Sequence, residues 1–180
     1  MKKVLLLHGW GGSDFPHWQS WIAGELARNY GCVNFLRFSD VDTPKFETWM
    51  QELEEVLNDF RPDIVLCHSL ANTLWFHIAA KKEFDTIEKL YLVAPPSLQC
   101  NIAELAEFFP VDTPKDLHAK EALLITSTND PYMTNQEAED LQKRLQIPRK
   151  IIKNGGHINA DSGFGAWGWL LEDLEKICKN

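Results

Sequence analysis

Residues 63–73, DIVLCHSLANT, combine a strand signal and a helix signal around one serine. The run before Ser69 is short, apolar and contains β-branched residues, which is typical of a buried strand. The residues from Leu70 onward have the composition of a helix. Ser69 is therefore expected on the turn between strand and helix, where it is either a nucleophile or simply a cap of the helix.

A strand and a helix that meet at so sharp a turn approach closely, so the residues two before and two after the serine must be small. The usual pattern is Gly-x-Ser-x-Gly, and here these positions hold Cys67 and Ala71. Both are small but neither is glycine, and such a motif also occurs by chance. Cys67 is interpreted as a small spacer that faces the sheet packing rather than as a thiol nucleophile.

Further apolar runs predict strands that alternate with helices along the chain. The predicted strands are KKVLLL (2–7), CVNFLRF (32–38), DIVLC (63–67), KLYLVA (89–94), EALLITS (121–127) and RKIIK (149–153). Most of them are continuously apolar, as expected for strands that are covered on both faces. The α/β alternation predicts a mostly parallel sheet of five or six strands with helices on both faces, joined by right-handed crossovers.

Helices are predicted where apolar residues recur at helical spacing. The clearest helix covers residues 46–60, and a second apolar stripe runs from 164 to 177. Thr134 and Glu137 have the spacing of a capping box, which predicts a helix that ends near Gln146. The tryptophans expected in the core, rather than in a cofactor or sugar platform, are Trp18, Trp21, Trp75, Trp167 and Trp169.

Length, charge and cysteine content limit the class of protein. A chain of 180 residues fits one domain, 1–180, which buries roughly 70% of its unfolded surface. The net charge is −8 and no basic stripe occurs, so we expect no nucleic-acid partner. The start, MKKVLLLHGW, is too short in apolar residues for a signal peptide or a membrane span. The four cysteines lack CxxC spacing, which favours reduced thiols and a cytoplasmic location.

Residues suited to acyl transfer follow three of the predicted strands. Ser69, Asp130 and His157 each come just past a strand end, and the carboxyl ends of parallel strands face a common crevice. A serine hydroxyl becomes a good nucleophile only when a base removes its proton, and a carboxylate must orient that base. The chain order Ser, Asp, His is that of the α/β-hydrolases, so we predict a catalytic triad of these residues.

Alternatives exist for each member of this set. His157 follows Gly155 and Gly156, which allow the loop to turn sharply toward the serine, although the residue alone is equally well read as a loop histidine without a task. Asp161 is an alternative acid, but its place in a turn-rich loop favours turn formation. His68 adjoins Ser69 and is expected to point away from it, in a packing or turn-stabilising role.

Two backbone amides are candidates for an oxyanion hole. In this architecture one N–H comes from the residue after the nucleophile, here Leu70, and another from the loop after an early strand, here Trp10. Gly9 lets the backbone approach a ligand, although an ordinary Gly-rich turn has the same composition. Gly9 and Trp10 are therefore predicted to bind substrate as well.

The connector 95–120 is predicted to form a small helix over the crevice and to line a modest acyl pocket. We expect Phe108 to contact substrate there, with the alternative that the connector only covers the sheet. Its apolar residues are Leu98, Ile102, Leu105, Phe108 and Phe109. Nothing encodes a long lipid tunnel, which favours small carboxylic esters or amides as substrates.

A metal site is not predicted. His8 and His17 flank Asp14, but their spacing matches no familiar zinc pattern. We expect neither a metal nor a cofactor.

Four stretches together resemble the small α/β serine hydrolases of the retinoblastoma-binding-protein-9 type, nearly end to end. They are HGWGGSDFPHWQSWI (8–22), CHSLA (67–71), STNDP (127–131) and GGHINADSGFG (155–165), the last being the most specific. The resemblance implies a reduced α/β-hydrolase fold, a triad carried onto Ser69, Asp130 and His157, and a metal-free, cofactor-free esterase-like or amidase-like activity.

Two positions depart from that family. Cys67 stands where glycine is frequent, which crowds the turn and bears on rate more than on chemistry. The retinoblastoma-binding motif L-x-C-x-E has its nearest counterpart at 98–102, LQCNI, which lacks the glutamate. We therefore expect no retinoblastoma-type partner.

Three functional classes are compatible with this pattern. The first is a serine hydrolase acting on small esters or amides through an acyl-enzyme. The second is a weakly active or inactive binding protein of the same fold, because fold alone does not prove function. The third is a thioesterase or acyltransferase that uses the same triad with another substrate or acceptor.

Overall fold

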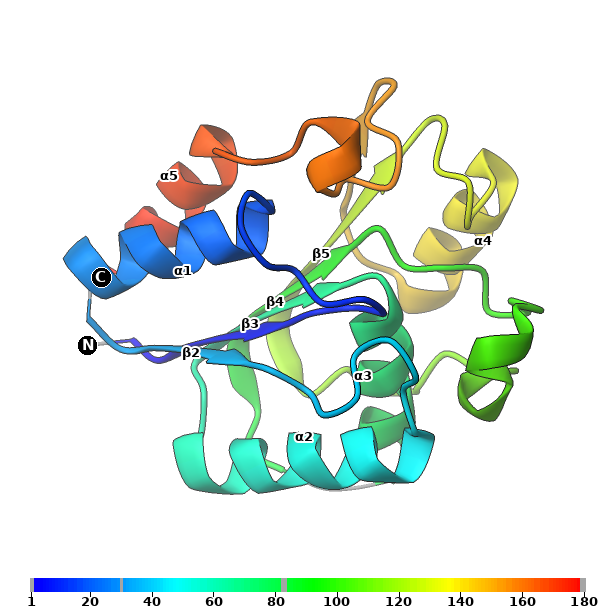
Figure 1. Cartoon of the computed structure of the whole chain (residues 1–180), viewed down its shortest axis with the longest axis horizontal. Helices are drawn as coiled ribbons and strands as arrows, with labels where there is room; N and C mark the ends of the chain where they lie inside the picture. Colours follow the sequence, from blue (N-terminus) through cyan, green and yellow to red (C-terminus); the bar gives the residue numbers. More distant parts are fainter. Residues whose placement is uncertain (1, 30, 82–83, 179–180) are drawn as a thin grey trace.

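The computed structural model describes residues 2–29, 31–81 and 84–178 and contains one parallel sheet of six strands (Figure 1). The strands are β1 (Val4–Leu7), β2 (Val33–Leu36), β3 (Ile64–His68), β4 (Ile87–Val93), β5 (Ala119–Ser127) and β6 (Arg149–Ile152). Their order is β2-β1-β3-β4-β5-β6, and every neighbouring pair is parallel. The predicted α/β class, and a sheet of five to six mainly parallel strands, are confirmed.

The described residues also form five α-helices and two short 3₁₀ helices. They are α1 (Trp18–Asn29), α2 (Phe46–Phe60), α3 (Leu70–Lys81), α4 (Asn135–Leu145), α5 (Gly168–Cys178), η1 (Ala103–Phe108) and η2 (Ala160–Ser162), of which η2 and α5 follow the last strand. Figure 1 shows α1 and α5 on one face of the sheet and α2 and α3 on the other. Coverage of both faces explains why the central strand β3 is apolar from Ile64 to Cys67, each of which is 0% exposed.

Each face of the sheet has its own apolar core. On the α1 and α5 side, Trp18 meets Trp167 edge to face, with ring centroids 5.3 Å apart. On the α2 and α3 side, Phe38 stacks on Trp49 at 4.5 Å. These aromatic side chains fill the space between helix and sheet, as the helical spacing of the apolar residues predicts.

The predicted helix boundaries hold at 46–60 and at the capping box. Thr134 accepts a hydrogen bond from the Glu137 N–H, and the Glu137 side chain accepts one from the Thr134 N–H. The last helix begins later than predicted, at Gly168 instead of near Phe164. Gly163, with φ 84°, ends η2 in a left-handed conformation, which interrupts the helical path before α5 starts.

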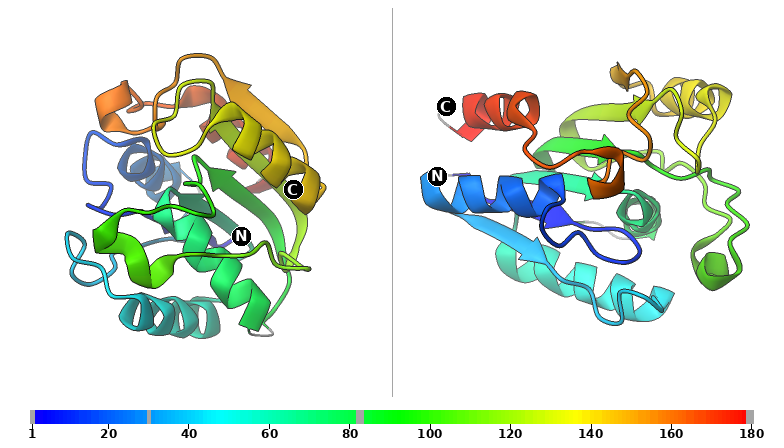
Figure 2. Two further views of the ribbon diagram at one scale, coloured as in Figure 1. Left: turned by 90° about the vertical axis from the view of Figure 1, so that its right-hand side faces the viewer. Right: turned by 45° about the horizontal axis from the view of Figure 1, so that its top comes forward.

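The connector between β4 and β5 lies beyond the carboxyl ends of the strands and contains the predicted small helix, η1 (Figure 2). Phe108 at its end is 0% exposed, and its ring packs edge to face against Phe46 and Trp49. This contact fastens the connector to α2.

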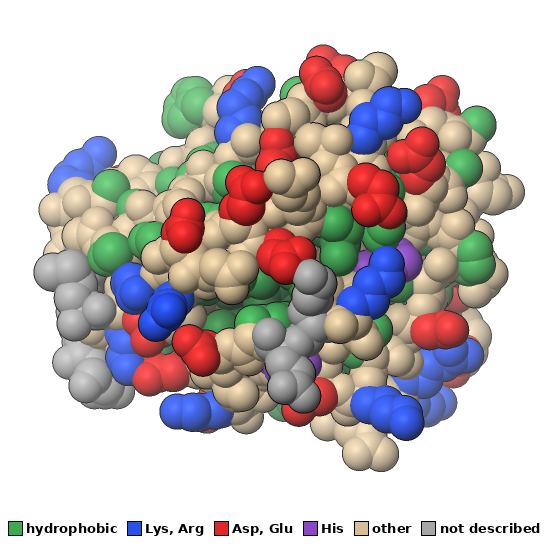
Figure 3. Space-filling model, turned by 90° about the horizontal axis from the view of Figure 1, so that it is seen from below, with side chains coloured by type: hydrophobic (Ala, Val, Ile, Leu, Met, Phe, Trp, Pro, Cys, Tyr) green, Lys and Arg blue, Asp and Glu red, His purple; other side chains and the backbone are tan. Residues whose placement is uncertain are grey.

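The outer surface of α2 is polar. Figure 3, which views the α2 side of the molecule, shows acidic and basic side chains interspersed over this face. Among the described residues, no helix is both long enough and apolar enough to cross a membrane.

Leu66 at the centre of β3 tests the packing of the sheet. The side chain is 0% exposed, so Leu66→Ala removes buried methyl groups and leaves a cavity that costs about 2 to 5 kcal/mol of unfolding free energy. Urea denaturation measures the loss. Ile151→Ala is the control, because Ile151 on the edge strand β6 is 49% exposed and should cost far less. Equal losses in both variants would contradict this assignment of the core.

Candidate active site

Ser69 occupies a strained turn between β3 and α3. Its φ is 54°, in the left-handed region that residues other than glycine rarely adopt. The Ser69 N–H donates to the Val93 carbonyl at 3.0 Å, which pins the turn to the neighbouring strand β4. The Asn72 side-chain amide donates to the carbonyls of Ser69 and Val93 at 2.8 and 2.9 Å. Together these bonds hold the backbone in a conformation that presents the serine side chain outward.

Small residues surround the turn. Cys67 and Ala71 are both 0% exposed and pack in the α2 and α3 core. Burial raises the pKa of the Cys67 thiol, so this group stays protonated and serves as a spacer. Gly9 lies against the turn from the next strand, since a Cβ on Gly9 would stand 2.7 Å from the Ser69 Cβ. The close approach therefore requires a glycine in β1's loop rather than in the elbow itself.

The structure brings Ser69, His157 and Asp130 into one hydrogen-bonded chain. The His157 Nε2 lies 2.8 Å from the Ser69 Oγ, and its Nδ1 lies 3.0 Å from both Asp130 carboxylate oxygens. The side chains of His157 and Asp130 are 9% and 3% exposed. Because a carboxylate accepts hydrogen bonds, the Nδ1 carries the proton, and the Nε2 lone pair faces the serine hydroxyl.

Polar residues tie the loop of Asp130 to the loop of His157. The Asn129 Oδ1 accepts hydrogen bonds from the Ser127 hydroxyl and from the Gly156 N–H, both at 2.8 Å. The Ser162 Oγ accepts from the His157 N–H at 3.2 Å. The bond between Asn129 and Gly156 therefore joins the two loops, and the bond to Ser162 holds the His157 backbone within its own segment.

Gly156 supplies the sharp turn before His157. Its φ is 54°, and a Cβ there would stand 2.3 Å from the Ser162 Oγ. Only glycine combines this backbone conformation with so close a neighbour. The sequence-based expectation for the Gly-Gly pair is met at this residue.

Sequence reasoning missed the side chains that support this arrangement. Asn72, Asn129 and Ser162 make the supporting hydrogen bonds, and the Tyr132 N–H donates to the Asp130 Oδ1 at 2.9 Å. Asn129, Tyr132 and Ser162 stand within five residues of Asp130 or His157. Their closeness in sequence to Asp130 or His157 was the one signal that could have pointed to them. Their hydrogen-bond partners, however, are set by how the loops fold against each other.

His68 packs beside the chain of hydrogen bonds and does not join it. Its Nε2 donates to the His157 carbonyl at 3.1 Å, and its ring lies 4.8 Å from the ring of His17 and 5.2 Å from that of His157. Burial first, and then these neighbours, lower the pKa of His68 well below its ordinary value, so the ring is neutral. His68 thus supports the His157 loop, in line with the predicted structural role.

His8, Asp14 and His17 form no ligand set. The His8 Nδ1–H donates to the Gly9 carbonyl at 2.7 Å, and its Nε2 accepts from the Phe38 N–H at 3.0 Å. The exposed Asp14 carboxylate pairs with Arg37 at 2.7 Å. Within residues 2–29, 31–81 and 84–178, no group of three or more His, Cys, Asp or Glu side chains is placed to hold a metal ion.

Two backbone amides beside Ser69 remain available to a ligand. The Gly11 and Gly12 N–H groups are used within the protein, on the carbonyls of Val41 and Gly9. None of the hydrogen bonds found in the described part of the chain uses the N–H of Trp10 or Leu70. Both residues line the same cavity as Ser69, and the Trp10 indole N–H is held by the Asp42 carbonyl at 3.0 Å.

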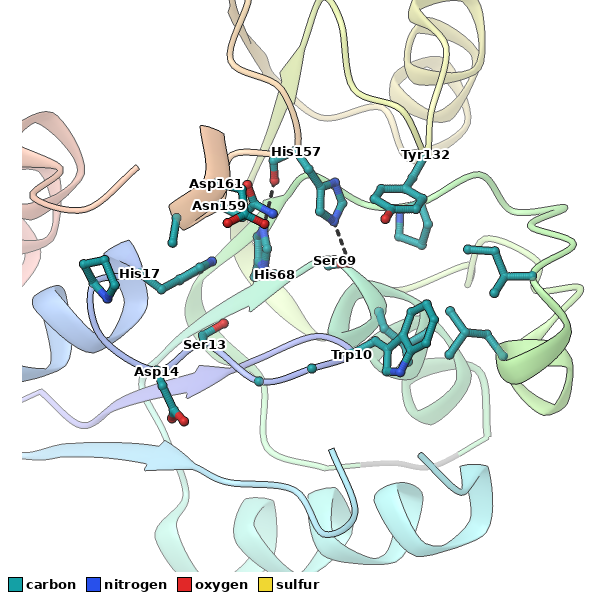
Figure 4. A pocket seen from close by; sticks show the side chains of 18 of the residues that line it. Trp10, Ser13, Asp14, His17, His68, Ser69, Tyr132, His157, Asn159 and Asp161 are labelled. Atoms are coloured by element: carbon teal, nitrogen blue, oxygen red, sulfur yellow. Dashed lines mark hydrogen bonds between the residues drawn. The ribbon is translucent and has the colours of Figure 1, made fainter. Parts of the chain in front are cut away.

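Ser69 and His157 open into a cavity of about 450 Å³ (Figure 4). Figure 4 shows Trp10 and Tyr132 on one side of Ser69, and Ser13 and His17 on the other. The apolar side is completed by residues of the connector, Ile102 and Leu105. The Trp10 side of the cavity is therefore apolar, whereas the other side carries the polar groups of Ser13 and His17 together with the apolar Phe15 and Pro16.

Two of the predicted substrate contacts lie outside the lining of this cavity. Phe108 does not line it, because its ring is buried against Phe46 and Trp49. Gly9 does not line it either, because its Cα packs against Ser69. Trp10, the third predicted contact, does line the cavity.

Asp161 lies at the edge of the cavity in η2 and is exposed. The carboxylate bonded to the His157 Nδ1 is that of Asp130. The turn-forming role predicted for Asp161 agrees with its position.

A family model described as serine hydrolase matches residues 4–176. The chain belongs to the serine hydrolase family.

Relatives of this serine hydrolase are similar over nearly their whole length. The Bacillus subtilis protein YdeN is 25% identical over 173 residues, which cover 91% of this chain and 89% of YdeN. The solved structure of the ydeN gene product has a TM-score of 0.87 at 19% identity, with full coverage of both chains. A YdeN-like protein from Pectobacterium atrosepticum gives 0.78 at 24% identity, covering 98% of this chain and 90% of its own. These likenesses establish the α/β-hydrolase fold.

Gly9 offers a test of the tight turn in this serine hydrolase. Gly9→Ala places a methyl group 2.7 Å from the Ser69 Cβ, so the turn must shift at a cost of about 1 to 3 kcal/mol. Thermal and urea unfolding measure it. Gly24→Ala in α1 is the matched control, because nothing lies within 4 Å of its Cβ and alanine favours a helix by about 0.5 to 1 kcal/mol. If Gly9→Ala stabilised the protein as Gly24→Ala does, the space beside Gly9 would be large enough for a methyl group, and the close contact with Ser69 would be wrong.

His17 makes stability depend on pH. Burial, followed by the nearby His157 and His8, lowers the pKa of His17 from 6.5 to about 4. The unfolded chain therefore binds this proton first on acidification, so stability is complete above pH 6.5 and decreases as the pH falls toward 4, by about 3 kcal/mol. Urea unfolding over this range measures the slope.

His17→Phe is the comparison for that slope, because it keeps a ring at the position and removes the titrating group. The variant should lose less stability between neutral and acidic pH than the parent. Identical pH profiles would exclude His17 as a source of the acid sensitivity.

Proposed function

We propose that this protein hydrolyses small carboxylic esters through an acyl-enzyme on Ser69, with His157 as general base and Asp130 as the orienting carboxylate. The observation that carries the proposal is the continuous chain of hydrogen bonds, 2.8 Å from Ser69 to His157 and 3.0 Å from His157 to Asp130, at the floor of a cavity. Membership of the serine hydrolase family agrees with it.

In the first half of the reaction, the Ser69 Oγ attacks the substrate carbonyl carbon while the His157 Nε2 takes the hydroxyl proton. The positive charge on the imidazole is stabilised by Asp130, whose side chain is 3% exposed. The tetrahedral intermediate then collapses, and His157 returns the proton to the leaving oxygen, so that an alcohol departs and an ester to Ser69 remains.

In the second half, a water molecule takes the place of the alcohol. His157 removes a proton from the water as it attacks the acyl carbon, and the second tetrahedral intermediate expels the serine oxygen, which regains its proton. The carboxylic acid leaves, and the free enzyme is restored. No metal or cofactor takes part in these steps.

The N–H groups of Trp10 and Leu70 are proposed to bind the oxyanion of both intermediates. They flank Ser69, they line the cavity, and none of the described hydrogen bonds uses them. A preorganised donor that meets the oxyanion rather than the ground-state carbonyl lowers the barrier by about 3 to 4 kcal/mol.

The size of the cavity favours small substrates. A volume of about 450 Å³ accommodates a short acyl group and a small alcohol but not a long lipid chain. Amides and thioesters react through the same acyl-enzyme and differ in the leaving group.

We further assign the protein to the retinoblastoma-binding-protein-9 type within its family, without a retinoblastoma-type partner and with a small molecule as its substrate. Two of the stretches that carry the resemblance, 8–22 and 155–165, contribute residues on the polar side of the cavity. A cytoplasmic location is proposed from the four cysteines, which are all free thiols.

A fluorophosphonate probe tests the nucleophile directly. We expect a mass adduct on Ser69 in the parent protein and none in Ser69→Ala, and we expect kcat/KM for p-nitrophenyl acetate to fall by about 10⁴-fold or more in that variant. Asp130→Asn should cost about 10⁴-fold in kcat, because the amide stabilises the wrong imidazole tautomer. Ser39→Ala is the control, since Ser39 lies outside the cavity and bonds to Glu52.

Failure of the folded parent protein to react with the probe would reject the hydrolase and favour a binding protein of the same fold. If Ser69 is labelled, p-nitrophenyl esters of increasing chain length, assayed beside acyl thioesters, distinguish an esterase from a thioesterase. The cavity volume leads us to expect the highest rates with the shortest esters.

A further inference from the structure

One wall of the cavity holds two buried polar groups that the reaction described above does not use. The Ser13 Oγ and the His17 Nε2 have no hydrogen-bond partner among the described residues. Ser13 is 3% exposed and His17 is 4% exposed, yet both line the cavity that contains Ser69. Figure 4 shows both side chains on the side of Ser69 opposite to Trp10.

The tautomer of His17 defines the chemistry of this wall. The Gln19 N–H donates to the His17 Nδ1 at 3.1 Å, so the Nδ1 is unprotonated and the Nε2 carries the hydrogen. The ring is neutral at physiological pH, since burial lowers its pKa to about 4. His17 therefore presents a neutral N–H donor, and Ser13 adds a hydroxyl that both donates and accepts.

Such groups are costly unless a ligand meets them. A buried polar group without a partner destabilises the free protein, and two such groups line this one cavity. When a substrate oxygen forms hydrogen bonds with these groups, the destabilisation is removed and binding is strengthened. An analogue without that oxygen leaves the groups unpaired and therefore binds more weakly.

The opposite wall and the rim limit which oxygen fits. Trp10, Ile102, Leu105 and Tyr132 make the opposite wall apolar, so it accepts the hydrocarbon half of a substrate. Exposed carboxylates of Asp14 and Asp161 stand at the edge of the polar wall.

Each charged ligand meets an unfavourable partner on this wall. A substrate carboxylate or phosphate is disfavoured by the exposed Asp161 carboxylate, whereas Asp14 is already paired with Arg37. An ammonium group placed against His17 meets the Nε2–H, which is a donor and not an acceptor. A neutral hydroxyl suits all of these groups, because its oxygen accepts from His17 and Ser13 while its hydrogen can bond a rim carboxylate.

We infer that Ser13 and His17 form a specificity subsite for the hydroxyl-bearing half of the substrate, which is a short-chain ester of a neutral polyol. This inference rests on the proposed ester hydrolysis at Ser69 and adds the class of alcohol. The two residues bind substrate without taking part in proton transfer at the scissile bond.

A matched pair of esters tests the subsite. Glycerol 1-monobutyrate and propyl butyrate share the acyl group and a three-carbon alcohol, and they differ only in the two hydroxyls. Their acyl-enzymes are identical, so the ratio of their kcat/KM values reports recognition of the alcohol. We expect the parent protein to favour the glycerol ester by about tenfold or more, as expected for one or two neutral hydrogen bonds.

Two independent variants remove the donors. Ser13→Ala and His17→Phe should each lower this ratio by about threefold, and the double variant should bring it near one. Should His17→Phe fold poorly, Ser13→Ala alone decides, because it removes a single oxygen. Ser39→Ala removes a serine hydroxyl outside the cavity and should leave the ratio unchanged.

The outcomes separate the subsite from the underlying chemistry. Labelling of Ser69 together with equal rates on both esters, or an unchanged ratio in Ser13→Ala, would overturn the subsite and leave the hydrolase intact. Absence of both labelling and ester hydrolysis would overturn the proposed function, and the subsite with it. A ratio that falls in both single variants supports the assignment.

Discussion

The left-handed backbone at Ser69 is the constraint on which the site depends. A φ of 54° costs a serine on the order of 1 kcal/mol, and it persists because bonds to Val93 and Asn72 and the close contact with Gly9 leave the turn no other path. Because of this conformation, the Ser69 hydroxyl projects away from both β3 and α3 at the carboxyl edge of the sheet. Every other group of the cavity is arranged around that fixed oxygen.

Hydrogen bonds from side chains to the backbone also hold the His157 loop in place. Asn129 binds it from the acid loop, Ser162 binds it from η2, and the His68 ring donates to the His157 carbonyl. Each of these bonds uses a backbone group of the loop, so the imidazole can meet Ser69 and Asp130 through its two nitrogens. The preorganisation thus comes from ordinary polar side chains in the loops and from one buried neutral histidine.

Much of this architecture follows from sequence patterns. Continuous apolar runs specified all six strands, and helical spacing specified 46–60, because burial on both faces of a sheet or on one face of a helix leaves a periodic record. The placement of Ser69, Asp130 and His157 at strand ends followed from parallel topology, in which those ends share an edge. The start of the last helix was misplaced, since Gly163 interrupts a stripe that remains apolar.

The direction of each side chain was decided only by tertiary contacts. Phe108 was predicted to face substrate, but its ring is buried against the rings of Phe46 and Trp49. No local sequence pattern distinguishes this buried position from one that lines the cavity. Ser13 and His17 looked like members of a Gly-rich loop and a helix start, and only the folded chain sets their unpartnered atoms beside Ser69. The sequence by itself determined the strands and helices, and the carboxyl edge of the sheet as the place of the candidate site. Both follow from hydrophobic periodicity and from the order of elements along the chain, which can be read without the folded structure. Long-range packing decided which groups line the cavity.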